Sequence, residues 1–349
     1  MTTTGAQRAF IGSFTTSGGR GIVQVTVDPG TGALTPTDAV ATVPNPSYLA
    51  LGRGSGGPVL YCVSETAEGA VAAYDVSGPA PEPIGRPVPV GGADPTHLAV
   101  AGGHLVTANY SSGSVTALPL AADGAPGAPS GLLGNKGSGP DADRQEGPHA
   151  HQVVVPEASG RWVLSVDLGT DEVRVCELDA ASGELRLHGA LELPPGTGPR
   201  HLVVHPRGTH VYVLGELRPV VTVCRWDAAA GELRAVGEYP LFPDGTDAHV
   251  QPSAPVISLD GRRLWAAVRG TDTVVVLSVS QDGERLEVLT SVPCGGSWPR
   301  DLVLHPSGDR LYAANERSGD VTWFDLDEDG VPRRAGSLEV PAASSVLFV

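Results

Sequence analysis

The chain has 349 residues, 41% of them hydrophobic, and a formal net charge of −16. This acidity argues against binding to nucleic acid or to an anionic membrane, because both need a cationic protein surface that displaces counterions. No apolar run reaches membrane-spanning length and no N-terminal run has the basic and apolar parts of a signal peptide, so we expect a cytoplasmic protein.

A motif returns about every fifty residues along the chain: a proline, one or two polar residues, an apolar strand, a turn and a second apolar strand. The leading prolines are Pro46, Pro95, Pro148, Pro199, Pro252 and Pro299, separated by 49, 53, 51, 53 and 47 residues. A period of this length is typical of stacked structural repeats, none of which can bury its faces alone. Six units are therefore predicted.

The two ends of the chain supply a seventh unit. The segment from residue 7 has the later strands of a repeat, whereas the C-terminal AASSVLFV has only its first strand. Pairing them would close a ring and hide the edge strands that an open array exposes. We therefore predict an all-β, seven-bladed β-propeller, closed by pairing of the C-terminal strand with the N-terminal blade, in one domain that spans residues 1–349.

The four cysteines lie on separate repeats, and none is part of a CxxC motif or has the spacing of a zinc site. They are Cys62, Cys176, Cys224 and Cys294. We expect them to be buried as small apolar side chains, without disulfides or structural zinc.

The blade pattern brings polar residues from distant repeats to one face. The loop that enters the innermost strand of a blade and the loop that leaves its second strand share this face, which we call the mouth. Among the residues expected there are Tyr48, Thr96, His97, Tyr110, His149, His151, Arg200, His201, Glu216, Arg269, Arg300, Asp301, Asn315 and Glu316. A concave site of this kind is suited to a small molecule.

Arg200 and Arg269 stand out in an acidic chain, because a charge near the axis needs an internal partner or an anionic ligand. Glu216 is the natural internal partner of Arg200, so a purely structural ion pair is one interpretation and a ligand clamp is the other.

The HAH sequence from His149 to His151 raises the question of a metal site, since alternate strand residues share a face. A third ligand such as His97 would have to come from another blade, and we expect no metal. There is also no nucleophile elbow, P-loop or dinucleotide motif, so we expect no cofactor.

The polar segment LLGNKGSGPDADRQ, residues 132–145, interrupts the repeat ahead of His149. A flap over the mouth and a disordered spacer are both compatible with its composition.

The repeats GPRHLVVHP…VYVLGEL, HAHQVVV…VDLGTDEV and VRGTDTVVVLSV resemble the lactonase family of seven-bladed propellers over essentially the whole chain. This family includes bacterial 6-phosphogluconolactonases and fungal carboxymuconate-lactonizing enzymes. The resemblance implies catalytic roles for His151, Arg200, Glu216 and Arg269. We expect substrate contacts from the neighbouring mouth residues His97, His149, His201, Arg300 and Asn315. The chain departs from the family pattern at Pro255, where relatives tend to carry an acidic residue, and at PRD, residues 299–301, in place of PRH.

The resemblance implies hydrolysis of an anionic sugar lactone, with 6-phosphogluconolactone of the pentose phosphate pathway as the leading substrate. Arg200 and Arg269 would hold the phosphate or polarise the ester carbonyl. His151 would activate water or protonate the leaving oxygen, and Glu216 would orient Arg200 or share the proton transfer. No metal or covalent nucleophile is expected.

Two other functions remain open from the sequence. A cycloisomerase of the muconate type would use the same arginines to make a lactone ring, and a non-catalytic propeller would bind a metabolite or a protein partner. We expect a monomer or a weak homo-oligomer.

Overall fold

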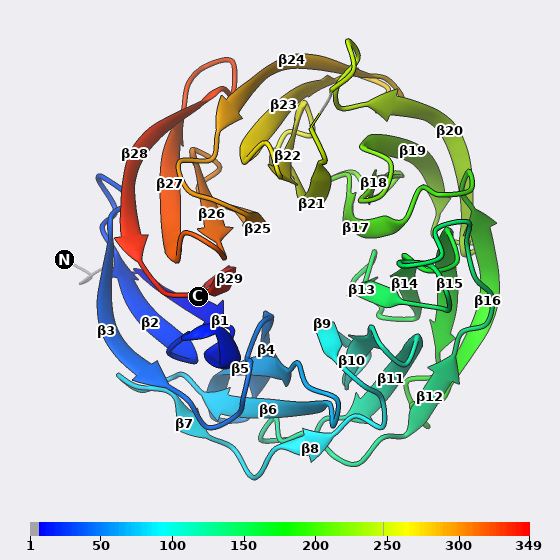
Figure 1. The fold of residues 1–349 in the computed structure, drawn as a ribbon. Coiled ribbons are helices and arrows are strands. Elements are labelled where there is room, and N and C mark those ends of the chain that lie inside the picture. Colours follow the sequence, from blue (N-terminus) through cyan, green and yellow to red (C-terminus); the bar gives the residue numbers. More distant parts are fainter. Residues whose placement is uncertain (1–6, 247) are drawn as a thin grey trace.

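The computed structural model describes residues 7–246 and 248–349. Their strands form seven antiparallel sheets, arranged as blades around a central axis with the first strand of each blade innermost (Figure 1). The predicted all-β, seven-bladed propeller is confirmed. Within the described residues, no helical segment has the length and hydropathy of a membrane span.

The blades are numbered in chain order, and their strands run from the axis outward. Blade 1 contains β29 (Ala343–Phe348), β1 (Gln7–Ser13), β2 (Ile22–Val27) and β3 (Leu34–Val40), with the short 3-10 helix η1 (Thr15–Ser17). Blade 2 contains β4 (Leu49–Gly54), β5 (Gly57–Ser64), β6 (Ala70–Asp75), β7 (Glu82–Pro83) and β8 (Val88–Pro89). Blade 3 contains β9 (Pro95–Ala101), β10 (His104–Asn109), β11 (Ser114–Pro119) and β12 (Gly131–Gly134).

Blade 4 contains β13 (Ala150–Val154), β14 (Trp162–Asp167), β15 (Glu172–Leu178) and β16 (Leu185–Glu192). Blade 5 contains β17 (Pro199–Val204), β18 (His210–Gly215), β19 (Val220–Asp227) and β20 (Glu232–Pro240). Blade 6 contains β21 (Gln251–Ile257), β22 (Arg263–Arg269), β23 (Thr273–Val279) and β24 (Leu286–Pro293). Blade 7 contains β25 (Pro299–Leu304), β26 (Arg310–Asn315), β27 (Asp320–Leu326) and β28 (Pro332–Glu339).

The ring closes inside blade 1, between the two ends of the chain. Strand β29 pairs antiparallel with β1, with Phe10 opposite Leu347 and Ile11 opposite Val346. The C-terminal strand thus becomes the innermost strand of the N-terminal blade, as the sequence predicts.

The apolar core is divided among the spaces between blades. Seven clusters of buried side chains are present in the described residues, and each joins two neighbouring blades. The second strands β10 and β18 are buried along their whole length, whereas the outer strand β20 is exposed or half-buried throughout and β24 alternates between covered and exposed residues. The four cysteines are buried, as expected, and are free thiols in the structure.

On the face opposite the mouth, aromatic side chains tie one blade to the next. Their polar atoms donate to backbone carbonyls in the outer turn of the following blade, at 2.8–2.9 Å: Tyr61 to Gly124, Trp162 to Ala228, Tyr212 to Gly283, Trp265 to Gly330 and Tyr312 to Gly32. These contacts combine a large buried surface with a satisfied polar group.

We expect Tyr212→Phe to lower the free energy of unfolding by about 1–2 kcal/mol, because the Gly283 carbonyl loses its donor. Denaturant unfolding measures this loss. A matched control is Tyr239→Phe, whose hydroxyl bonds the Glu284 carbonyl in a half-buried place and whose loss should cost less. Equal stability of wild type and Tyr212→Phe would contradict a role for these contacts.

Candidate functional site

The innermost strands carry β-bulges at their mouth ends. In blade 5, Pro199 pairs with Gly215 and His201 pairs with Leu214, so Arg200 is the extra residue of the bulge. The same shift in register makes His151 the extra residue in blade 4 and Arg300 the extra residue in blade 7. Thr96 and Ser344 hold this position in blades 3 and 1, and in blade 6 the shift includes Ser253. A bulge re-aims a side chain, and here bulges deliver residues from six blades to the axis.

Several bulge residues bond the backbone of the next blade. The hydroxyls of Thr96, Ser253 and Ser344 donate to the carbonyls of His151, Pro299 and Ser47 at 2.9, 2.6 and 2.8 Å. Arg200 Nη1 donates to the Ser253 carbonyl. These bonds fix the positions of neighbouring blades at the mouth.

Three arginines share the Glu216 carboxylate. Arg269 Nη2 lies 2.6 Å from Oε2, Arg200 Nε lies 3.1 Å from the same oxygen, and Arg144 Nη2 lies 2.6 Å from Oε1. The Arg200 contact has ion-pair distance without hydrogen-bond alignment, so Arg200 is held mainly through Ser253. One carboxylate thus faces three guanidiniums in the interior of a chain of net charge −16.

The charges of this group differ in how well they are satisfied. Burial alone would raise the pKa of Glu216, but the three arginines, with Arg269 contributing most, lower it to about 2. Burial and the nearby Arg269 lower the pKa of Arg200 below its ordinary value. The carboxylate is stable as an anion, whereas the guanidiniums have more positive charge than Glu216 can balance.

Three histidines pack beside this group. The ring centroids of His97 and His151 lie 5.5 and 5.3 Å from that of His201, and Tyr48 lies 3.9 Å from His97. Burial, reinforced by Arg200, lowers the pKa of His97 to about 3 and those of His151 and His201 well below the usual value. All three imidazoles are therefore neutral at neutral pH. The Nδ1 atoms of His97 and His151 are buried without a hydrogen-bond partner among the described residues.

These histidines should make the fold sensitive to acid. Between about pH 6.5 and 3, the unfolded chain binds protons that the folded imidazoles do not, so the free energy of unfolding falls as the pH falls. Asp301, whose pKa burial raises to about 6, and Glu65, whose pKa burial also raises, act in the opposite direction, but they are two groups against three histidines and Glu216, whose pKa is lowered. We expect the urea midpoint to be highest at or above pH 7 and to fall toward pH 4. His97→Gln should flatten this slope, and a midpoint that rises between pH 7 and 5 would contradict the assignment.

Arg300 belongs to a second group of charges, which comes from blades 7 and 2. Its Nη1 lies 3.1 Å from Glu316 Oε2, and its Nη2 lies 3.6 Å from Glu65 Oε1. Asp301, the acidic residue of the PRD departure, accepts the Val346 N–H of β29 at 3.1 Å. This departure therefore ties blade 7 to the closing strand.

The structure places the remaining predicted site residues in different ways. His149 lies at the rim, stacked on Tyr110 at 4.4 Å and with Nε2 3.1 Å from Glu146 Oε1. Asn315 is fully buried and donates to the Thr322 hydroxyl of β27 at 3.1 Å. Its amide bonds within blade 7, so the structure does not bring it together with the axial residues. No group of three or more His, Cys, Asp and Glu is arranged as a metal site in residues 7–246 and 248–349.

One residue of the group, Arg144, escaped sequence reasoning. It belongs to the segment of residues 132–145, which is structured: β12 covers its start, and the rest forms a loop. The fully buried side chain of Gln145 anchors that loop by donating to the Leu168 carbonyl and to Asp171 Oδ1, both at 2.8 Å. The anchor is a polar side chain in a polar segment, so the composition of the segment does not reveal it.

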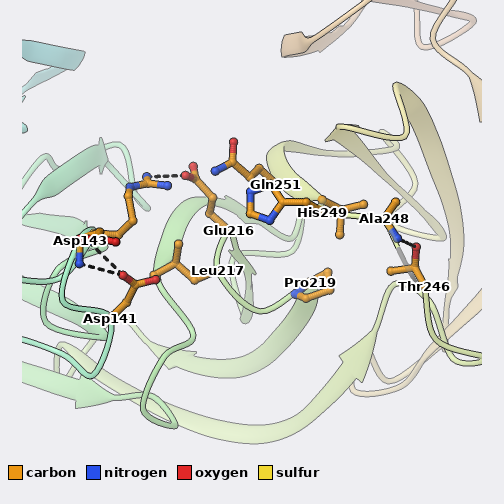
Figure 2. Close-up of a pocket in the computed structure, with 11 residues that line it drawn as sticks. Asp141, Asp143, Glu216, Leu217, Pro219, Thr246, Ala248, His249 and Gln251 are labelled. Atoms are coloured by element: carbon orange, nitrogen blue, oxygen red, sulfur yellow. Dashed lines mark hydrogen bonds and ion pairs between the residues drawn. The ribbon is translucent and has the colours of Figure 1, made fainter.

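Two cavities adjoin the group. The axial cavity, lined by His151, Arg200, His201 and Arg300 among others, has a volume of about 10 Å³, room for no more than one water. A cavity of about 510 Å³ lies beside it, between the loop of Asp141 and Asp143 and the segment that leads into β21 (Figure 2). Glu216 and Arg144 line this larger cavity, which is large enough for a sugar-sized molecule.

Comparison with known proteins places the chain in a family. A family model described as Lactonase, 7-bladed beta-propeller matches residues 8–348. The 6-phosphogluconolactonase of Bacillus subtilis (strain 168) is 32% identical over 325 residues, 92% of this chain and 91% of that protein. A crystal structure of a Lactobacillus plantarum protein matches with 29% identity, a TM-score of 0.91 and coverage of 99% and 100%. The periplasmic gluconolactonase of Pseudomonas aeruginosa matches with 27% identity, a TM-score of 0.89 and coverage of 99% of both chains. The chain therefore belongs to the lactonase family of seven-bladed β-propellers.

Proposed function

We propose that the protein hydrolyses the lactone ring of an anionic sugar acid, with 6-phosphogluconolactone as the substrate. The observation that supports this most is the set of three guanidiniums around Glu216, whose surplus positive charge suits an anion. Both the family and the name of the Bacillus subtilis relative agree with it. A phosphorylated sugar is an intracellular metabolite, so we place the protein in the cytoplasm.

In the proposed reaction, Arg200 and Arg269 stabilise the negative charge that develops on the carbonyl oxygen as water attacks. Guanidinium donors held in place before the reaction are effective in this role, since they need no reorganisation. The bond from the water oxygen to the carbonyl carbon forms first, and the bond from that carbon to the ring oxygen then breaks. The products are the open-chain acid and a free hydroxyl.

His151 serves as the proton carrier in this proposal. Its imidazole is neutral and its Nδ1 has no protein partner among the described residues, so it can accept the proton of the attacking water. The positive charges of Arg200, Arg300 and Arg269 contribute to its low pKa. An anionic substrate offsets these charges and makes His151 a stronger base when the substrate is bound. The same proton then passes to the leaving ring oxygen.

Glu216 orients the arginines and does not transfer protons. With a pKa of about 2 it holds no proton at neutral pH. Of the two roles that the sequence leaves open for Glu216, the proposal keeps only orientation. A lactone is an activated ester, so the ~10²- to 10⁴-fold help that general acid–base catalysis typically gives is enough, and we propose that no metal takes part.

The test is the initial rate of 6-phosphogluconolactone opening at neutral pH, followed by pH-stat titration and corrected for spontaneous hydrolysis. A rate well above that background is the expected result. A wild-type protein that leaves the background unchanged would overturn the proposal. A parallel ultraviolet assay with a carboxymuconate would then detect the cycloisomerase reaction.

A further inference from the structure

The loop that carries Arg144 is held firmly in place. Asp141 Oδ1 accepts the backbone N–H groups of Asp143 and Arg144 at 3.0 and 3.1 Å, which fixes the turn. Asn135 donates to Asp167 Oδ2 at 2.5 Å at the other end of the loop. Together with the Gln145 anchor, these bonds position the Arg144 backbone and leave the orientation of its long side chain to Glu216 and Tyr110.

Arg144 is the accessible member of the arginine group. Its side chain is 32% exposed, whereas those of Arg200 and Arg269 are 2% and 6% exposed. Arg144 therefore lies between solvent and the buried pair, Arg200 and Arg269. A molecule that approaches the buried pair from the 510 Å³ cavity meets Arg144 first, since Arg144 lines that cavity.

Glu216 has two other cationic neighbours besides Arg144, which is the hydrogen-bond partner of its Oε1. Its Oε2 already faces Arg200 and Arg269, so a third guanidinium adds positive charge to a carboxylate that is already paired. The only other polar contact of the Arg144 guanidinium in the described residues is the Tyr110 hydroxyl at 3.5 Å, which is long for a hydrogen bond. This guanidinium thus has donors available for a ligand.

The lining of the cavity shows where an anion can bind. The carboxylates of Asp141, Asp143 and Glu216 also line the cavity. The two aspartates repel an anion from their part of it, although Asp141 is engaged in the turn, whereas Arg200 and Arg269 offset the charge of Glu216. Carboxylates and the Gln251 amide are suited to the hydroxyl groups of a sugar. An anionic substituent is therefore favoured at Arg144, with the hydroxyls toward Asp141 and Asp143.

We propose that Arg144 binds the phosphate of the substrate and so sets the preference for a phosphorylated over an unphosphorylated sugar lactone. This inference rests on the proposed function. In a δ-lactone the ring oxygen links the carbonyl carbon to the carbon that bears the phosphorylated arm, so the two groups lie on one side of the ring. The guanidiniums of Arg144 and Arg269 bind the two oxygens of the Glu216 carboxylate and are therefore also close together. In this arrangement Arg144 binds the phosphate and Arg269 lies near the carbonyl.

The experiment compares 6-phosphogluconolactone with glucono-δ-lactone for wild type, Arg144→Gln and Arg144→Lys. We expect Arg144→Gln to lower kcat/KM for the phosphorylated lactone by about 10- to 100-fold, which is the usual effect of losing a hydrogen bond to a charged group. The value of kcat/KM for glucono-δ-lactone should change by less than about threefold. Arg144→Lys keeps the charge and should retain part of the preference. The matched control is Arg218→Gln, a half-exposed arginine nearby that pairs with Glu238 and does not line the cavity.

A second measurement separates this inference from the proposed function. Calorimetric titration with inorganic phosphate and with 6-phosphogluconate measures anion binding without turnover. If the wild type hydrolyses neither lactone, the proposed function fails, yet phosphate binding that Arg144→Gln abolishes would still support the site. Equal losses for both lactones, or phosphate binding that is absent from the wild type or unchanged in Arg144→Gln, would overturn the role of Arg144.

Discussion

Replacing Arg200 by alanine is expected to lower kcat/KM for 6-phosphogluconolactone by about 10²- to 10³-fold, the usual cost of removing one donor to a developing oxyanion. Arg200 is the bulge residue of β17, and its position is set by the Ser253 carbonyl and by Glu216. Arg200→Lys keeps the charge but loses the paired donors, so it should recover only part of the rate. Initial rates above spontaneous hydrolysis measure both variants.

Circular dichroism and thermal unfolding must show that Arg200→Ala is folded. Arg186→Ala is a suitable control, because Arg186 is exposed and pairs with Glu184 on blade 4, outside the mouth. Its rate should equal that of the wild type. Wild-type turnover in a folded Arg200→Ala protein would remove Arg200 from the mechanism.

Glu216→Gln is expected to lower the free energy of unfolding by about 3–5 kcal/mol. The substitution keeps the shape of the side chain but leaves Arg200, Arg269 and Arg144 without their shared counter-charge. Since two of these guanidiniums are almost fully buried, solvent cannot replace the carboxylate. Denaturant unfolding at neutral pH measures the effect.

A second substitution tests the cause of this loss. Arg144→Gln in the Glu216→Gln protein removes one of three mutually repelling charges and should restore part of the stability, whereas Arg144→Gln alone should change it little. Glu232→Gln, which breaks the exposed pair with Arg234, is the control and should be neutral. A Glu216→Gln protein as stable as the wild type would show that the arginines do not depend on this carboxylate.

The large-scale fold follows from the repeat, and so does the place of the site. The spacing of the prolines predicts the blades, and the incomplete repeats at the two ends predict the pairing of β1 with β29. The alternation of strand direction brings Arg200, Glu216 and Arg269 to one face, where the structure places them in direct contact.

What the sequence could not show depends on local geometry. A bulge has no clear sequence signature, so the register shifts that aim His151, Arg200 and Arg300 at the axis appear only in the structure. Asn315 is the last residue of β26, and Glu216 comes directly after β18, so the two residues have similar places in their blades. The Asn315 amide nevertheless donates to Thr322 within its own blade. The loop of Arg144 is held by the polar side chain of Gln145, and its polar, Gly-rich composition is the same as that expected of a disordered spacer.

The closure of the ring has a consequence for the synthesis of the protein on the ribosome. Blades 2 to 7 are each continuous in sequence and can pair their strands soon after they emerge, but blade 1 is incomplete until β29 emerges. The clusters that join blade 1 to blades 7 and 2 include Val346 and Phe348 in one and Leu347 and Val349 in the other. Until these residues leave the exit tunnel, both clusters are incomplete and the inner edge of β1 is unpaired. The inner edge of β1 therefore stays open to aggregation until β29 emerges, and this strand converts an open arc into the finished ring.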